Sequence, residues 1–233
     1  MITVIGEVMA AGERMARGLA GLDEAAVRGD SGLAGWSRGY AASHVVRSID
    51  AYLWLLAWAR DGVQPGPRAT GAEIAAAVEA GAGGSGGELA AELRGRLATL
   101  EEAVAGMPAE RWEFLVSALP GWRHPAWYTV NRCWREIETH HVDLAVGYRP
   151  ADWSAAYVRW ALDDTLAALA AREFPVGEVK ATDLGRSWRV DGEGPVVGAP
   201  GHVLLAWLSG RGPGENGWPA PPTWPLPPSP GWG

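Results

Sequence analysis

The segment of residues 132–144 holds the side chains whose types and spacing come closest to a chemical site. Within a predicted helix, Glu136 and His140 are four residues apart, so both project from one face within one turn. A carboxylate and an imidazole placed in this way can share one divalent metal ion. Their direction lies about 100° from the apolar arc of the helix, because each residue advances the helix by that angle. The pair is therefore expected at the rim of the core, where a bound ion can meet a cleft.

A metal site needs a third ligand, and His44 is the best candidate. Among the histidines outside that segment, it alone lies inside a long predicted helix. The neighbours on its helix face, Tyr40, Ser48 and Ala51, are mostly small and leave room beside the imidazole. Two histidines and one glutamate suit zinc with a fourth position open, as in catalytic sites. Taken alone, His44 fits a packed or hydrogen-bonded core histidine better than a metal ligand.

Other interpretations of the same segment stay open. The charged stripe can be a solvated helix face with pairs at helical spacing; it consists of Arg132, Glu136, His140 and Asp143. Glu138 and His141, three residues apart, resemble the spacing of dimetal helical bundles, but those need several more carboxylates. Cys133 lacks the surrounding residues of a known nucleophile motif, and a thiol in a buried helix usually serves packing.

Composition excludes several classes of protein. The chain has 233 residues and a formal net charge of −7, which argues against a nucleic-acid-binding surface. A single cysteine excludes an internal disulfide and suits a reducing compartment. The longest apolar run, residues 51–59, is shorter than the roughly 20 residues that span a bilayer. Charged residues interrupt residues 1–20, unlike a signal peptide. We therefore expect a cytoplasmic protein without nucleic-acid or membrane partners.

Helical periodicity dominates the chain and predicts the elements that must position the site. The predicted helices cover residues 4–19, with a possible extension over 23–28, and residues 37–60, 70–80, 88–105, 125–146, 154–172 and 202–209. Residues 112–119 are predicted to form a strand or an extended arm over the helices. Residues 176–197, interrupted by Gly185, Gly192 and Gly194, are predicted to form a small β-meander.

These elements predict a mainly α fold. A four-helix bundle is expected over residues 1–172, and a small α/β domain over residues 173–212. Residues 213–233 are rich in proline, glycine and tryptophan, so this tail is expected to be extended or disordered. Such a segment can also dock on an aromatic groove of a partner, which would make the protein a scaffold.

Three motifs occur in the order typical of one family. They are Ser-Gly-Leu-Ala-Gly-Trp-Ser-Arg-Gly at residues 31–39 followed by His44, Trp-Arg-Glu-Ile-Glu-Thr-His-His-Val-Asp-Leu at residues 134–144, and Leu-Leu-Ala-Trp-Leu-Ser-Gly-Arg at residues 204–211. With these motifs the chain resembles the mycothiol-dependent maleylpyruvate isomerase family over nearly its whole length up to Arg211. The resemblance implies a DinB-like helical bundle, a small α/β C-terminal domain, and a divalent metal, usually zinc, held by His44, Glu136 and His140.

The resemblance also implies a chemistry. The metal would bind a low-molecular-weight thiol, expected to be mycothiol, and activate it as a thiolate that attacks an electrophilic small molecule. The outcome would be an isomerisation of the maleylpyruvate type or a thiol S-transfer, and the sequence does not choose between them. A non-catalytic metal-binding or small-ligand-binding module, acting in regulation or self-protection, is the alternative. The oligomeric state is not determined by the sequence.

Two further residues enter through the resemblance. Arg211 is implied to contribute to activity, and we expect its guanidinium to pair with a carboxylate on the substrate or the thiol cofactor. The alternative for Arg211 is an exposed residue that stabilises the end of a helix. Tyr40 stands where the family often has a histidine, so we expect it to face the same cleft and contact the cofactor.

Overall fold

The computed structural model describes residues 2–190, 193–228 and 232, arranged in two compact units, Met1–Gly147 and Tyr148–Gly233. Residues 191–192 of the predicted meander and residues 229–231 and 233 of the predicted tail lie outside the described residues. Among the described helices, none is long and apolar enough to cross a membrane. The protein is mainly helical with a small sheet in its C-terminal part, as the sequence predicts.

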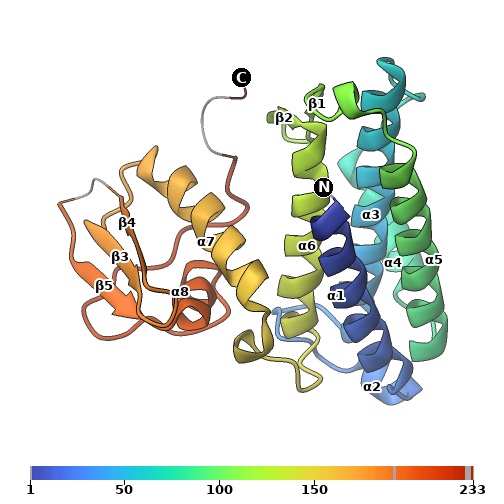
Figure 1. The fold of residues 1–233 in the computed structure, drawn as a ribbon. Helices are drawn as coiled ribbons and strands as arrows, with labels where there is room; N and C mark the ends of the chain where they lie inside the picture. Colours follow the sequence, from blue (N-terminus) through green and yellow to red (C-terminus); the bar gives the residue numbers. More distant parts are fainter. Residues whose placement is uncertain (1, 191–192, 229–231, 233) are drawn as a thin grey trace. The chain divides into compact units, whose positions relative to one another are not determined.

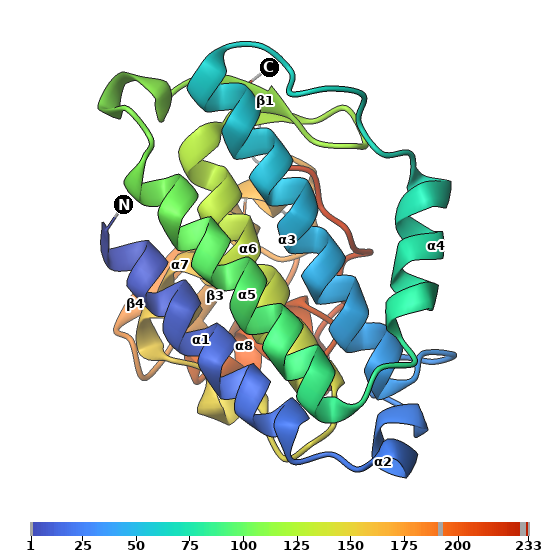
Figure 2. The same ribbon diagram turned by 90° about the vertical axis from the view of Figure 1, so that its right-hand side faces the viewer.

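Four long helices build the first unit, and Figures 1 and 2 show them side by side. They are α1 (Ile2–Ala20), α3 (Arg38–Asp61), α5 (Gly86–Ala105) and α6 (Ala126–Asp143). Both α1 and α3 pack against α5 and α6, so the helices close a four-helix bundle. The fully buried side chains of its core include Met15, Leu19, Ile49, Leu55, Leu56, Leu89, Leu93, Leu97, Leu100 and Ile137. Burial of each such side chain contributes roughly 1.5–3 kcal/mol.

Capping residues set where the helices of the bundle begin and end. Ser37 caps α3 by accepting a hydrogen bond from Tyr40 N, and Gly62 ends it in the left-handed conformation with φ 75°. A capping box formed by Thr70 and Glu73 opens α4 (Gly71–Gly81), in agreement with the helix predicted from residue 70. A second capping box, formed by Ser85 and Glu88, starts α5 two residues before the predicted position.

Shorter elements join the long helices. The predicted extension of the first helix is a separate helix, α2 (Glu24–Arg28), because Asp23 caps a new start. The single-turn helix η1 (Ala109–Arg111) precedes β1 (Leu115–Ser117), which pairs antiparallel with β2 (Arg123–Pro125). The strand predicted within residues 112–119 is therefore one arm of a hairpin. Its second arm leads directly into α6 and fixes where that helix starts.

The second unit begins before the predicted domain boundary. It contains η2 (Pro150–Asp152), α7 (Ala155–Ala170), a three-stranded sheet and α8 (Gly201–Leu208). The sequence places α7 with the bundle because its periodicity resembles that of the bundle helices. In the structure α7 belongs to the second unit, where it packs against α8.

The sheet corrects the predicted meander. Its strands β3 (Glu178–Ala181), β4 (Arg186–Arg189) and β5 (Val196–Ala199) lie in the order β4-β3-β5. The first two are antiparallel as in a meander, but β5 runs parallel to β3 along its other edge. Gly194 permits this return, since a Cβ atom there would lie 2.0 Å from the carbonyl oxygen of Pro175.

The described part of the tail contacts α8. Residues 213–228 form no helix or strand. Trp207 Nε1 donates a hydrogen bond of 3.1 Å to Pro219 O, and Trp224 Nε1 donates one of 2.7 Å to Leu208 O. The ring of Trp218 lies 4.7 Å from that of Trp207. This part of the tail is thus irregular and packed.

Candidate metal centre

Three potential ligands meet between α3 and α6. Nε2 of His44 lies 2.8 Å from Oε1 of Glu136, and Nε2 of His140 lies 3.4 Å from the same oxygen. The ligand atoms of the three residues all lie within 4.8 Å of one another. Among the described residues, this is the one group of three or more histidine, cysteine or carboxylate residues so arranged. The structure thus brings together the three residues that the sequence singles out.

The donor set fits a zinc ion. Two ligands bound tetrahedrally to zinc at about 2.1 Å lie about 3.4 Å from each other, close to the observed separations. Two imidazole nitrogens and one carboxylate oxygen are the ligands that zinc prefers, and three protein ligands leave a fourth position for a small molecule. The side chains remain partly accessible, with exposed fractions of 31% for His44 and 21% for Glu136. An ion held here would meet solvent or a ligand.

Ser48 and Trp36 complete the surroundings. Ser48 Oγ donates a hydrogen bond of 2.9 Å to Oε1 of Glu136. The ring of Trp36 stacks on that of His140 at 6.1 Å and 15°, and lies edge-on to His44 at 5.0 Å. The loop that carries Trp36 is tied to the end of α6, since Gly32 N donates to the carbonyl oxygen of Asp143. The motif at residues 31–39 therefore covers one side of the candidate site.

Contacts between carboxylates and imidazoles shift the pKa values of Glu136 and His140. Burial disfavours the ionised form of Glu136, but hydrogen bonds from His140 and His44 outweigh it and hold the pKa of this carboxyl well below its usual range. Burial also lowers the pKa of His140, but Asp143 and Glu136 outweigh it and raise the value to about 9. A metal ion that binds His140 must therefore displace a proton at neutral pH.

The alternative pair faces another helix. Glu138 is fully buried, and its Oε1 lies 2.8 Å from Nη2 of Arg14 on α1. His141 is buried beside the same helix, where a Cβ atom added to Gly18 would lie 3.5 Å from its Nε2. Cys133 is also buried, and this burial raises the pKa of its thiol. Neither the alternative pair nor the thiol lies in the group formed by His44, Glu136 and His140.

The two residues suggested by resemblance alone have different settings. Tyr40 lies on α3 one turn before His44, and its ring contacts that of Trp36 at 4.7 Å. Arg211 belongs to the second unit and follows α8; its Nη1 donates a hydrogen bond of 2.6 Å to Ser209 O. That bond satisfies a carbonyl at the end of the helix. Contacts of either residue with a thiol or a substrate remain predictions.

Sequence reasoning missed two contacts of this site. Asp143 lies three residues after His140, so helical spacing alone could have paired them. Ser48 is noted in the sequence only as a small neighbour of His44. Its hydrogen bond to Glu136 depends on how α3 and α6 cross, for which the sequence gives no signal.

The fold and the site together define a helical-bundle protein with a candidate divalent-metal centre. The family model described as the mycothiol maleylpyruvate isomerase N-terminal domain matches residues 8–145. The chain therefore belongs to the mycothiol maleylpyruvate isomerase family. No curated protein matches it significantly.

Two crystal structures share the fold of this chain. One is the mycothiol-dependent maleylpyruvate isomerase, with a TM-score of 0.79 and 22% identity, covering 95% of this chain and 96% of that one. The other is a histidine-to-alanine mutant of that isomerase, with a TM-score of 0.79, 21% identity and the same coverage. The likeness thus extends beyond the matched domain to the second unit.

Proposed function

We propose that this protein catalyses the mycothiol-dependent cis–trans isomerisation of maleylpyruvate or a closely related cis-enedione acid. One observation carries the proposal: ligand atoms of His44, Glu136 and His140 lie within 4.8 Å of one another in a chain of this family. The names of the similar crystal structures suggest the thiol and the substrate.

The reaction needs a reactive thiol and a substrate held beside it. A divalent cation, expected to be zinc, would act as a Lewis acid that lowers the pKa of a bound thiol. In the proposed reaction, the thiol sulfur adds to one carbon of the cis double bond, and rotation about the resulting single bond follows. Expulsion of the same thiol then forms the trans double bond. The thiol is regenerated and no electrons are lost, so no further reactant is required.

The residues of the chain have distinct parts in this proposal. Nε2 of His44, Nε2 of His140 and Oε1 of Glu136 would hold the cation. Ser48 fixes the carboxylate of Glu136 through its hydrogen bond. Trp36 would shield the ring of His140 from that side.

Two residues are proposed to contact the ligands directly. Tyr40, one turn from His44, would contact the thiol cofactor. Arg211 would bind a carboxylate of the substrate or the cofactor through its planar guanidinium. Both assignments rest on the family resemblance, and each can be tested by substitution.

A turnover assay with product masses tests the proposal. Zinc-loaded full-length protein is incubated with mycothiol and maleylpyruvate, and products are separated by chromatography with mass detection. We expect a product of unchanged mass with the retention of the trans isomer, and none from His140→Ala. A product heavier by the mass of mycothiol would indicate an S-transferase instead. Tight zinc binding without either product would indicate a non-catalytic binding module.

A further inference from the structure

Two cavities with shared lining residues lie along α3. The smaller has a volume of about 110 Å³, and Ser48, Arg68 and Arg132 supply its main polar groups. The larger has a volume of about 280 Å³ and lies between α3 and α4. Both cavities share Ala51, Arg68 and Ile74 as lining residues, so Arg68 contributes to both.

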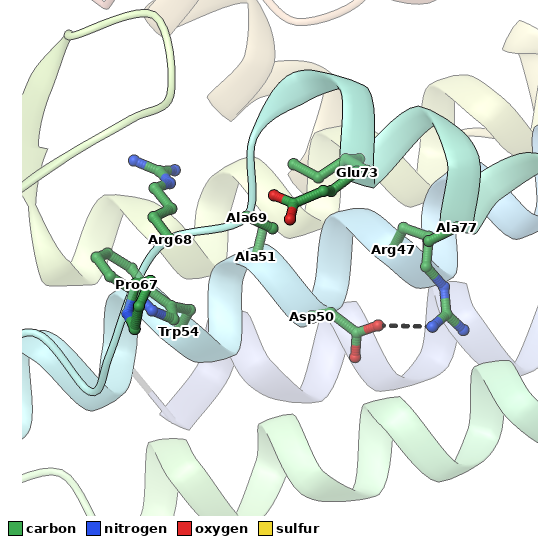
Figure 3. Close-up of a pocket in the computed structure, with 10 residues that line it drawn as sticks. Arg47, Asp50, Ala51, Trp54, Pro67, Arg68, Ala69, Glu73 and Ala77 are labelled. Atoms are coloured by element: carbon green, nitrogen blue, oxygen red, sulfur yellow. Dashed lines mark ion pairs between the residues drawn. The ribbon is translucent and has the colours of Figure 1, made fainter.

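Apart from Arg68, the charged side chains of the larger cavity have partners. Figure 3 shows Arg47 with Asp50 at one end and Arg68 with Trp54 at the other. Nη1 of Arg47 lies 3.0 Å from Oδ2 of Asp50. The carboxylate of Glu73 accepts hydrogen bonds from the backbone and side chain of Thr70. The larger cavity therefore offers no uncompensated positive charge apart from Arg68.

The two arginines of the smaller cavity lack an acidic partner. Arg68 donates through Nη1 to Ser117 O at 2.6 Å, and its guanidinium lies 5.3 Å from the ring centre of Trp54. Arg132 donates through Nη1 to Nε2 of His124 at 3.1 Å, and lies 5.5 Å from the ring centre of Tyr52. Within the described part of the chain, neither forms an ion pair with a carboxylate. Nη2 and Nε of each side chain remain to bind a ligand.

Both guanidinium groups therefore carry positive charge without a carboxylate at ion-pair distance in the described part of the chain. Burial and the nearby charge of Arg132 lower the pKa of Arg68. His124 cannot compensate, because an imidazole carries no negative charge. The protein has a formal net charge of −7, so a pair of uncompensated arginines is not a consequence of a basic composition. An anion bound between them would relieve their repulsion.

Two residues that line the smaller cavity lie close to Glu136, one on each helix. Arg132 precedes Glu136 by four residues on α6, which is one turn and about 6 Å along the helix axis. On α3, Ser48 lines the cavity and donates its hydrogen bond to Oε1 of Glu136. The lining of the cavity thus reaches residues close to Glu136 on both helices.

We propose that Arg68 and Arg132 form a carboxylate-binding subsite, which holds one carboxylate of the substrate while its double bond lies at the metal centre. The chemistry fits because guanidinium groups bind carboxylates through paired hydrogen bonds. This inference rests on the proposed function for the identity of the substrate. In this proposal the two arginines select an acidic electrophile, and the reaction takes place at the metal centre.

Binding of maleate tests the subsite without turnover. Zinc-loaded full-length protein is titrated calorimetrically with maleate, and uncharged dimethyl maleate serves as the control ligand. We expect Arg68→Gln and Arg132→Gln each to raise the Kd for maleate at least tenfold. Arg94→Gln removes one charge from an exposed ion pair with Glu13, outside both cavities, and should leave the Kd unchanged. Zinc content and thermal melts confirm that each variant is folded.

Several outcomes would overturn the subsite. Wild-type protein that does not bind maleate, or variants that bind it with the wild-type Kd, would do so. Maleate binding that depends on zinc but on neither arginine would place the carboxylate on the metal instead. Arg132 contacts buried His124, so its substitution can affect folding. If Arg132→Gln misfolds, the Kd of Arg68→Gln decides the test, because Arg68 lies in a loop.

Kinetics separates this inference from the proposed function. Isomerisation of maleylpyruvate with wild-type KM in both arginine variants would retain the function and reject the subsite. Maleate binding that needs both arginines, in a protein without isomerase activity, would retain the subsite and reject the function. With both correct, KM for maleylpyruvate rises at least tenfold in the variants, and kcat falls less.

Discussion

Oδ2 of Asp143 lies 2.9 Å from Nδ1 of His140, three residues earlier on α6. In zinc sites, a ligating histidine commonly points its other ring nitrogen at a carboxylate, which fixes the tautomer and raises the basicity of the ligating nitrogen. Here that carboxylate faces Nδ1, while Nε2 of His140 faces Glu136. The arrangement makes Asp143 a positioning residue for His140.

The variant Asp143→Asn should therefore weaken metal binding without removing a ligand. Loss of such a carboxylate typically lowers metal affinity about 10- to 100-fold. Competition with a chromophoric chelator measures the zinc Kd of the purified variant. Asp50→Asn, which alters an acidic residue on α3 paired with Arg47, serves as the control and should keep the wild-type Kd. An unchanged Kd in Asp143→Asn would contradict the positioning role.

Substitutions at Glu136 and Glu138 should affect different properties, zinc affinity and stability respectively, although the two residues are only two positions apart in the sequence. Glu136→Gln should strongly lower zinc affinity, because this carboxylate faces His44 and His140. Glu138→Gln should keep the zinc but lower the free energy of unfolding by about 1.5–3 kcal/mol, because it breaks the hydrogen-bonded ion pair with Arg14. Chelator competition and denaturant unfolding measure the two effects. If Glu138→Gln lowered the zinc affinity more than Glu136→Gln, the metal would be assigned to Glu138 and His141 instead.

Local signals predict much of this fold. The capping box of Thr70 and Glu73 and the glycine at residue 62 mark helix ends that the structure confirms. The parallel pairing of β5 with β3 was not predictable, because short strands of similar composition can pair along either edge. The membership of α7 in the second unit was not predictable either, since it depends on packing against α8.

The candidate site, like the fold, is only partly predictable from the sequence. Helical spacing alone pairs Glu136 with His140, because both lie on one element. The contact of Ser48 with Glu136 requires α3 and α6 to meet at one particular level. The approach of Arg68 to Arg132 requires the loop after α3 to fold back over it, as the shared cavity indicates. Such contacts between elements leave no periodic signal in the sequence.

His124 should make the stability of the protein depend on pH. Its Nε2 accepts the hydrogen bond of Arg132, so Nδ1 carries the proton and donates to Pro125 O at 3.1 Å. Burial lowers the pKa of His124 to about 4, and the positive charges of Arg132 and Arg68 act in the same direction. In the unfolded chain its pKa is about 6.5, so between these two values the unfolded state binds more protons. Stability is thus full above about pH 6.5 and falls as the pH approaches 4.

The variant His124→Gln isolates this effect, since glutamine can accept the same hydrogen bond but does not titrate. From pH 7 to pH 4.5 the wild type should lose about 2–3 kcal/mol more free energy of unfolding than the variant. Denaturant unfolding at both pH values measures the difference, and contributions of other carboxylates cancel between the two proteins. Equal losses in both proteins would mean that the pKa of His124 is the same in the folded and unfolded states.

Arg211→Lys tests whether the second unit contributes to the reaction. The present contact, from Nη1 of Arg211 to Ser209 O, serves the end of α8, and lysine can still place a positive charge there. Lysine lacks the planar fork that binds a carboxylate through two hydrogen bonds. If Arg211 binds substrate or thiol, kcat/KM falls at least about tenfold, or roughly 1.4 kcal/mol, with the melting temperature nearly unchanged. Steady-state kinetics and thermal melts of this one variant separate the two roles. Unchanged kinetics would leave Arg211 as a helix-end residue and restrict the active site to the first unit.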